Sequence, residues 1–216
     1  MKVVIIGAGH AGVQAAVSLR EEGFEGEITL ISEENDLPYQ KPPLSKGYLQ
    51  GKQSAEAIIF RSENYYSSNQ IDLKLGVKIS EINPNNNSIQ TIDGQTIEYS
   101  HLILATGANN RKLNIEDAEI LYLRTLSDAK LIEQKLKTAE KVAIIGGGFI
   151  GLELAALAQE KGKKVSVIEA QSRLMERVLP AIISEVFQET RNTPTKWCRN
   201  ITQYFYRVHS RKKYQD

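Results

Sequence analysis

Short apolar runs separated by a helical pattern dominate the first half of the chain. Residues 3–6 and 28–31 are continuous apolar runs, which are typical of strands buried on both faces of a parallel sheet. Residues 13–19 repeat apolar positions with a helical period, and this pattern stops near Gly23. The same order recurs from residue 141 onward. It predicts an α/β fold built from two Rossmann-like dinucleotide-binding units.

A different period occupies residues 76–100. Apolar and polar positions alternate there, and turn signals lie at residues 83–87 and at Asp93-Gly94. This pattern predicts a strand that ends in Ile79, followed by a hairpin and a buried strand over residues 102–105. We therefore expect a small antiparallel β insertion in the first unit.

The first apolar run leads into a glycine loop of the kind that binds dinucleotides. Gly7 would make the tight turn, Gly9 would let the backbone approach a pyrophosphate, and Gly12 would allow close packing of helix and strand. The pyrophosphate would lie at the helix N-terminus, where N–H groups and the helix dipole favour an anion. Glu33, after the second strand, is placed to accept hydrogen bonds from a ribose. The alternative is a glycine-rich turn without a ligand.

The second unit repeats this spacing. Gly146, Gly148 and Gly151 have the same spacing as the three glycines of the first loop, and Glu169 lies at the end of the following strand. An acid at that position binds the ribose 2′-hydroxyl of NAD and repels the 2′-phosphate of NADP. Two such loops on one chain suit an enzyme that brings two dinucleotides together.

The segment "LPYQKPPLSKGYL", residues 37–49, comes shortly after Glu33. Its two adjacent prolines lack N–H donors, so we expect a rigid loop and a helix that starts near Leu44 or Ser45. Lys46 would then lie in the first helical turn and face the ligand of the first loop. The alternative is a solvated surface lysine.

These motifs together resemble the FAD-dependent NAD(P)H:ferredoxin or rubredoxin reductases of the pyridine nucleotide-disulfide oxidoreductase superfamily. The resemblance covers about residues 2–188, including "GVKISEINPNNNSIQTIDGQTIEYSHLILATGA", "YLRTLSDA" and "VAIIGGGFIGLELAA". It implies a flavoprotein oxidoreductase that passes electrons from NADH through FAD to a ferredoxin- or rubredoxin-type carrier serving an oxygenase. No cysteine lies in residues 40–50, where the related disulfide reductases place redox thiols, so electrons would leave the flavin directly.

The resemblance also implies roles for individual residues. Lys46 would lie beside the flavin ring. Glu153 would reach Lys46 near the flavin and the nicotinamide. A surface position is the alternative for Glu153, and a surface salt bridge is the alternative for Arg124. Toward FAD the implied residues are Gly7, Gly9, Ala11, Gly12, Glu33, Lys46, Ile79, Thr106, Gly107 and Arg124; toward NAD they are Gly146, Gly148, Ile150, Gly151 and Glu169.

Composition limits the class of protein. The chain has 216 residues, of which 41% are hydrophobic and 25% charged, with a formal net charge of +1, as expected of one or two globular domains. No apolar run approaches the roughly 18 residues of a membrane span, and the N-terminus does not read as a secretory signal. The single cysteine, Cys198, fits a reducing compartment. We expect a cytoplasmic protein with no membrane, nucleic-acid or metal partner.

The resemblance ends before the last 27 residues, 190–216. Seven basic residues and one acidic residue lie there, whereas residues 1–189 contain 20 basic and 25 acidic ones. We expect domains at 1–112 for FAD and 113–189 for NAD, the second incomplete, and a foreign basic tail that is disordered unless residues 202–207 add to the sheet edge. A natural basic docking arm is the alternative for the tail. For the whole chain, the alternative function is that of a truncated, inactive remnant that binds nucleotides weakly.

Overall fold

The computed structural model describes residues 1–113, 115, 119–184 and 201–203. The chain divides into two compact units, Met1–Ala129 and Lys130–Asp216, and each is described by itself. This division differs from the boundary after residue 112 that the sequence suggested, and the assignment of one cofactor to each part stays a prediction.

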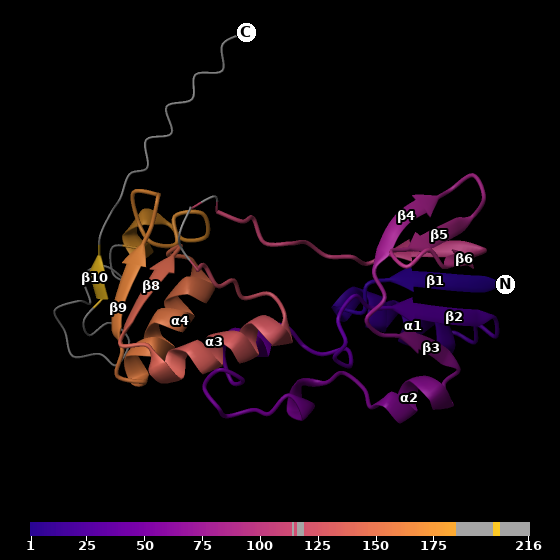
Figure 1. The fold of residues 1–216 in the computed structure, drawn as a ribbon, viewed down its shortest axis with the longest axis horizontal. Helices are drawn as coiled ribbons and strands as arrows, with labels where there is room; N and C mark the ends of the chain where they lie inside the picture. The colour runs from indigo at the N-terminus through magenta and orange to yellow at the C-terminus, as the bar shows by residue number, and fades with distance from the viewer. Residues whose placement is uncertain (114, 116–118, 185–200, 204–216) are drawn as a thin grey trace, which may run out of the picture. The chain divides into compact units, whose positions relative to one another are not determined.

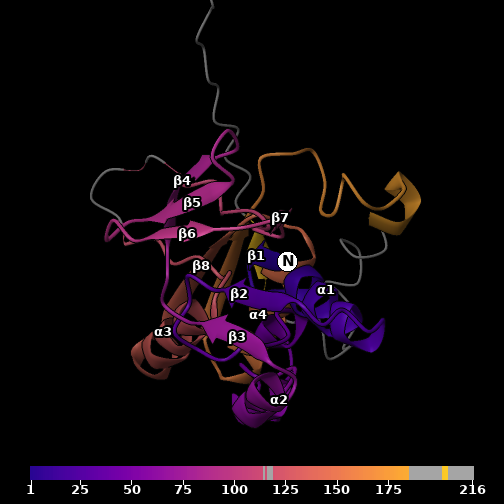
Figure 2. The same ribbon diagram turned by 90° about the vertical axis from the view of Figure 1, so that its right-hand side faces the viewer.

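The first unit is built on a four-stranded parallel sheet in the order β3-β2-β1-β7, in which β1 to β3 are labelled in Figure 1 and β7 in Figure 2. The strand β1 is central, and its residues from Val3 to Ile6 are buried, as the continuous apolar run predicted. The helix α1 connects β1 to β2, and the short helix α2 precedes β3. The bounds are β1 Lys2–Ile6, α1 His10–Glu21, β2 Glu27–Ile31, η1 Pro42–Ser45, η2 Glu56–Ile58, α2 Glu63–Ser68, β3 Ile71–Lys74 and β7 His101–Leu104.

A three-stranded antiparallel sheet covers one face of this parallel sheet (Figure 2). It consists of β4 (Ile79–Asn83), β5 (Ser88–Thr91) and β6 (Thr96–Glu98), and the predicted β insertion is thereby confirmed. Ile89 and Ile97 from this sheet form a core with Val4, Ile6 and Ile31. The opposite face packs on α1 and on Tyr66 of α2, so the parallel sheet is buried between two layers.

Two details of the predicted strands were wrong. The strand predicted to end in Ile79 begins there, because Gly76 (φ +69°) turns the chain and the Val77 N–H bonds the Ser32 carbonyl before β4 starts. The strand β7 is not fully buried. Leu104 is 60% exposed, because β7 pairs only with β1 among the residues that the structure describes.

The second unit repeats the strand, helix and strand order. The strands β8 (Lys141–Ile145) and β9 (Lys164–Ile168) are parallel, and α4 (Phe149–Glu160) connects them. The helix α3 (Leu126–Thr138) precedes β8. Buried residues of α4 and β9, among them Leu157, Val165 and Val167, form the apolar interior. The predicted fold class, two α/β units with parallel sheets, is confirmed.

The strand β10 (Ile201–Gln203) departs from the expectation for the tail. It pairs in parallel with β9, from Ile201 opposite Val165 to Gln203 opposite Val167, and gives the sheet order β10-β9-β8. The unpaired N–H and C=O groups of a sheet edge accept any extended segment of suitable length. The sequence predicted an ordered tail only if residues 202–207 added to the sheet edge. The strand β10 makes such a pairing, but it starts one residue earlier and ends at Gln203. The prediction of disorder for the rest of the tail lies outside the described residues.

Candidate dinucleotide-binding sites

The first glycine loop joins β1 to α1. Gly7 has a φ of +103°, and its N–H donates to the Ile31 carbonyl at 2.8 Å. A Cβ on Gly12 would lie 1.8 Å from the carbonyl oxygen of Gly7, and a Cβ on Gly7 would lie 2.2 Å from that of Ala105. Only glycine fits these two positions, since one needs a positive φ and both bring backbones together.

The second loop, between β8 and α4, has the same geometry. Gly146 has a φ of +109°, and its N–H donates to the Ile168 carbonyl at 2.8 Å. A Cβ on Gly151 would lie 2.0 Å from the carbonyl oxygen of Gly146. The two loops are therefore structural equivalents, although they lie in different units.

Both helices present free donors toward solvent at their N-termini. Gly9 and Gly148 are the N-caps, and the first intrahelical bonds run from Val13 to Gly9 and from Leu152 to Gly148, both at 3.0 Å. The N–H groups before them have no intrahelical acceptor, as at every helix start. These groups belong to residues 10–12, including Ala11, and to residues 149–151, including the exposed Ile150.

The space in front of the loops fits a pyrophosphate. A Cβ built on Gly9 or on Gly148 meets no atom within 4 Å, so the approach to the helix N-terminus is open in both units. N–H donors together with the positive end of the helix dipole favour an anion at this place. The residues present therefore fit the diphosphate of a dinucleotide at each loop.

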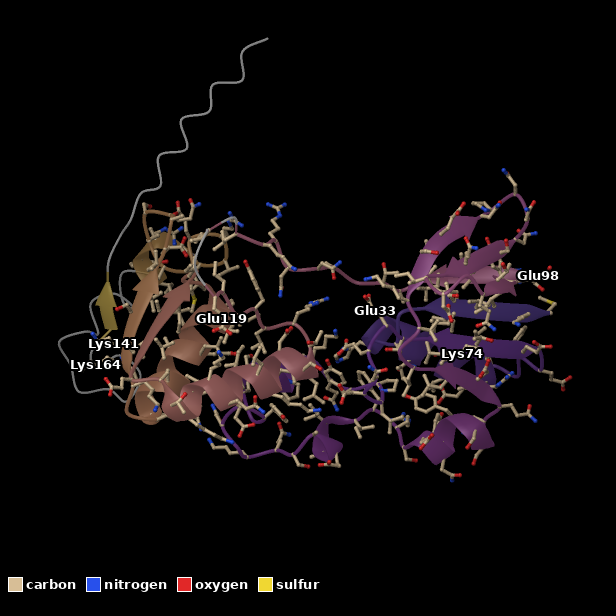
Figure 3. The ribbon with its side chains drawn as sticks, viewed as in Figure 1. Glu33, Lys74, Glu98, Glu119, Lys141 and Lys164 are labelled. Atoms are coloured by element: carbon tan, nitrogen blue, oxygen red, sulfur yellow. The ribbon has the colours of Figure 1, made fainter. Side chains whose placement is uncertain are left out.

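The two acids that follow the loops have different partners. Glu33 lies beyond the end of β2 at the surface (Figure 3), where its carboxylate pairs with Lys78 at 2.5 Å. Glu169 instead accepts hydrogen bonds from two backbone N–H groups, those of Gly147 at 2.6 Å and Gln171 at 2.9 Å. Glu169 is therefore held by its own glycine loop, whereas Glu33 pairs with an exposed lysine at the surface.

The loop that contains Lys46 differs from the prediction. Its helical turn is the 3₁₀ helix η1, which starts at Pro42 and ends at Ser45, so the exposed Lys46 lies just after the helix and not in its first turn. Proline is tolerated in a first helical turn, because the N–H groups there have no intrahelical acceptor. The Lys46 N–H bonds the Pro43 carbonyl at 3.0 Å.

A buried tyrosine that the sequence did not single out holds this loop. The Tyr39 hydroxyl donates to Glu34 at 2.5 Å and accepts from the Leu126 N–H at 2.7 Å, across 87 positions of sequence. Lys41 also pairs with Glu34, at 2.9 Å. Burial, together with the Glu34 carboxylate, raises the pKa of Tyr39 far above its ordinary value. No sequence pattern pointed to this contact, because its two ends are distant along the chain.

The same tyrosine brings the segment of Arg124 close to the first unit's loops. The Arg124 guanidinium lies beside Gly107, where a Cβ would stand 3.1 Å from its Nη2 atom. Asp128 accepts from the N–H groups of Arg124 and Thr125, at 2.9 and 2.8 Å, and the Asp128 N–H bonds the Thr125 hydroxyl. This capping box at the start of α3 was readable in the sequence "TLSD" and was missed.

The remaining residues occupy surfaces near their loops. Thr106 and Gly107 are exposed directly after β7, and Ile79 is the half-buried first residue of β4. Glu153 is half-buried in the second turn of α4. Lys46 and Glu153 belong to different units, so their pairing stays a prediction. Among the described residues, no helix has both the length and the apolar character needed to cross a membrane.

Two relatives of known name match most of the chain. Rhodocoxin reductase from Rhodococcus erythropolis is 44% identical over 190 residues, which are 87% of this chain and 44% of that protein. Rubredoxin-NAD(+) reductase from Pseudomonas putida is 43% identical over 182 residues, 83% of this chain and 47% of that protein. The chain spans about half the length of the curated relatives it matches.

Solved structures and a family model agree with this result. The covalent putidaredoxin reductase–putidaredoxin complex matches with a TM-score of 0.86 at 35% identity, over 94% of this chain and 49% of that one. The ferredoxin reductase for the CYP199A2 system from Rhodopseudomonas palustris has the same TM-score at 40% identity, over 94% of this chain and 50% of that one. The model for pyridine nucleotide-disulphide oxidoreductases matches residues 1–193. The resemblance seen in the sequence is confirmed, and the chain belongs to the pyridine nucleotide-disulphide oxidoreductase family.

Proposed function

We propose that the chain is the dinucleotide-binding part of an NADH-dependent flavoprotein reductase, with FAD at the first glycine loop and NADH at the second. The electrons pass to a ferredoxin- or rubredoxin-type carrier that serves an oxygenase. The observation behind the proposal is the repeated loop geometry at Gly7–Gly12 and Gly146–Gly151, with an acid after each. The names of the relatives, which are reductases of rhodocoxin and rubredoxin, support the choice of acceptor class.

FAD supplies the chemistry that a protein side chain lacks, since it takes a hydride and releases electrons one at a time. The residues of this chain would bind and orient FAD and NADH. The N–H groups of residues 10–12 would hold the diphosphate of FAD, and those of residues 149–151 would hold the diphosphate of NADH. Lys46 and Arg124 would supply positive charge beside the flavin ring. Glu169 accepts from the ribose 2′-hydroxyl of NADH and repels a 2′-phosphate.

A second reading is that the chain by itself binds nucleotides weakly and does not catalyse. The fact that favours it is the coverage of 44% and 47% of the two relatives. Within the described residues, β7 and β8 each pair on one side only. A nucleotide bound beside an edge strand has fewer neighbouring residues to contact than one bound within a larger sheet, so it binds less tightly.

One titration series separates the readings. Binding of FAD to the chain is followed by quenching of flavin fluorescence, and binding of NADH by its own fluorescence. We expect stoichiometric FAD binding that Gly9→Asp weakens at least 100-fold, because the open space accommodates the side chain while its charge repels the diphosphate. Gly148→Asp should weaken binding of NADH alone. Gly9→Ser adds a side chain without the charge, so the difference between Gly9→Ser and Gly9→Asp measures the electrostatic repulsion.

Failure of FAD to bind at micromolar concentrations would favour the second reading. Equal effects of Gly9→Asp and Gly148→Asp on both nucleotides would contradict the assignment of one nucleotide to each loop.

A further inference from the structure

One buried side chain joins two distant segments of the first unit. Lys46 lies just after η1 and Arg124 just before α3, and both are cations expected beside the flavin ring. Tyr39 precedes η1, and its hydroxyl accepts a hydrogen bond from the Leu126 N–H at 2.7 Å. This bond fixes the place of one segment relative to the other.

The ring of this tyrosine is anchored without its hydroxyl. The Phe60 N–H donates to the Pro38 carbonyl at 2.9 Å, directly before Tyr39. The Gln40 N–H, directly after it, donates to the Ile58 carbonyl at 2.8 Å. The Tyr39 side chain is 4% exposed. Replacement by phenylalanine should therefore leave the ring in place and remove only the oxygen atom.

The hydroxyl makes two bonds of opposite direction. It donates its proton to the Glu34 carboxylate at 2.5 Å and accepts from Leu126. Burial and the Glu34 carboxylate raise the pKa of Tyr39 far above its ordinary value, so the hydroxyl keeps the proton that it donates. Lys41 pairs with the same carboxylate at 2.9 Å, so the three side chains together carry no net charge. The cluster is therefore suited to fix positions and adds no charge to the site.

The bond to Leu126 also holds the start of α3. The N–H groups in the first turn of a helix have no intrahelical acceptor, and the Tyr39 hydroxyl supplies one. The N–H groups of Arg124 and of the next residue bond the Asp128 carboxylate, at 2.9 and 2.8 Å. Every backbone N–H from Arg124 to Leu126 is therefore bonded. The Arg124 guanidinium lies beside Gly107, with its Nη2 atom 3.1 Å from the place of a Cβ.

We propose that Tyr39 is the positioning residue of the first dinucleotide site. Its hydroxyl holds the segments of Lys46 and Arg124 in the arrangement that binds the flavin end of FAD, and it acts through these two residues. The proposal rests on the function proposed above, since it concerns FAD at the first glycine loop. The ADP part of FAD depends instead on residues 7–12 and on Glu33. Loss of the hydroxyl should therefore affect the flavin end more than the ADP part.

The probes are FAD and ADP, and the quantity measured is the ratio of their affinities for the full chain. Quenching of flavin fluorescence gives the affinity for FAD, and displacement of FAD gives that for ADP at the same loop. We expect Tyr39→Phe to lower the preference for FAD over ADP about tenfold, because the two cations lose charge-assisted contacts with the flavin end. A protein that is merely less stable loses both affinities by the same factor, so the ratio stays unchanged.

Two further variants test whether the effect runs through the flavin end. Tyr66→Phe is the matched control, because it removes a hydroxyl that is also buried in the first unit but has no hydrogen-bond partner among the described residues. It should leave the ratio unchanged. Arg124→Gln should lower the ratio by itself. Combined with Tyr39→Phe, it should lower the ratio by less than the product of the two single effects, because both changes remove the same contact.

Glu34→Gln provides the test if Tyr39→Phe does not fold. It keeps an oxygen that accepts from the Tyr39 hydroxyl, but it weakens that bond and removes the ion pair with Lys41. The preference for FAD over ADP should then fall about threefold.

Failure of this proposal can be told apart from failure of the proposed function. A parent chain that does not bind FAD would overturn both. A parent chain that binds FAD, with a ratio unchanged in Tyr39→Phe, or in Glu34→Gln where Tyr39→Phe does not fold, would overturn the positioning role alone. The same holds for an equal fall in Tyr66→Phe, and for single effects of Tyr39→Phe and Arg124→Gln that multiply in full.

Discussion

The two units contain the same strand, loop and helix, yet their surroundings differ. In the first, β1 lies between β2 and β7, and its residues from Val3 to Ile6 are buried. In the second, β8 is an edge strand of the described sheet, and Ile145 at its end is 51% exposed. The glycine loops nevertheless have φ values of +103° and +109° at their first glycines.

This comparison separates local from tertiary causes. The loop geometry follows from glycine spacing and from the packing of one helix on its own strand, because Gly12 and Gly151 contact the loop carbonyls in the same way. The burial of the central strand depends on a neighbour that comes from far along the chain. The first unit obtains that neighbour in β7, about 100 residues after β1.

The largest expected effect comes from alanine at the first glycine of each loop. Gly7→Ala should destabilise the first unit by about 2–6 kcal/mol, because a strained φ and a clash with the Ala105 carbonyl add together. Gly146→Ala should cost only about 1–3 kcal/mol, since no atom lies within 4 Å of the new Cβ. Hydrogen exchange of peptides from β1 and β8 measures both opening free energies. Equal losses would mean that the two loops are equally packed.

The next effect concerns a contact that only the first unit has. Tyr39→Phe should lower the free energy of unfolding by about 2–5 kcal/mol, because it removes a bond to the Glu34 carboxylate and leaves the buried Leu126 N–H without its acceptor. Urea unfolding followed by circular dichroism measures the loss. Tyr99→Phe, at another tyrosine of the same unit, is the control and should change stability by less than about 1 kcal/mol.

Alkaline pH should destabilise the first unit more than the second, because the first unit contains buried tyrosines that ionise when it unfolds. Burial raises the pKa of Tyr66 to about 12, with Arg61 opposing the shift, and the pKa of Tyr39 is raised further. Tyrosine in the unfolded chain titrates near pH 10, so the stabilisation is complete below pH 10 and is lost as the pH rises toward 12.

The slope should reach about 1.4 kcal/mol per pH unit for each buried tyrosine. The described part of the second unit contains no tyrosine, so β8 peptides should keep their protection over this range better than β1 peptides. Urea midpoints of the parent chain and Tyr66→Phe at pH 9 to 12 provide the check. A parallel decline in both proteins would show that Tyr66 does not contribute.

The smallest effect on stability concerns the two acids. Glu169→Ala should cost about 1–3 kcal/mol, because the N–H groups of Gly147 and Gln171 lose a charged acceptor. Glu33→Ala should cost less than about 1 kcal/mol, because its pair with Lys78 is exposed at the surface. Thermal unfolding compares the stability of the two variants. A larger loss of stability in Glu33→Ala would contradict the view that Glu169 is the more strongly held of the two acids. Glu169→Ala should also narrow any preference for NADH over NADPH by about 1–3 kcal/mol in a loaded enzyme.

The sequence by itself determined the local units. Glycine spacing and apolar runs predicted the strands β1, β2, β8 and β9, the glycine loops between strand and helix, and the antiparallel insertion, because these depend on residues close in the chain. Local rules also explain one error. The prolines of η1 were read as a barrier to the helix, although a first turn tolerates them.

Only the tertiary structure decided which distant residues meet. The contact of Tyr39 with Leu126, the position of Arg124 beside Gly107, and the pairing of β10 with β9 join segments between about 20 and 90 residues apart. The unpaired hydroxyl of Tyr66 likewise became visible only once α2 packed on the sheet. The physical reason is that such contacts depend on how whole helices and strands pack together. The spacing of residues within one segment carries no information about that packing.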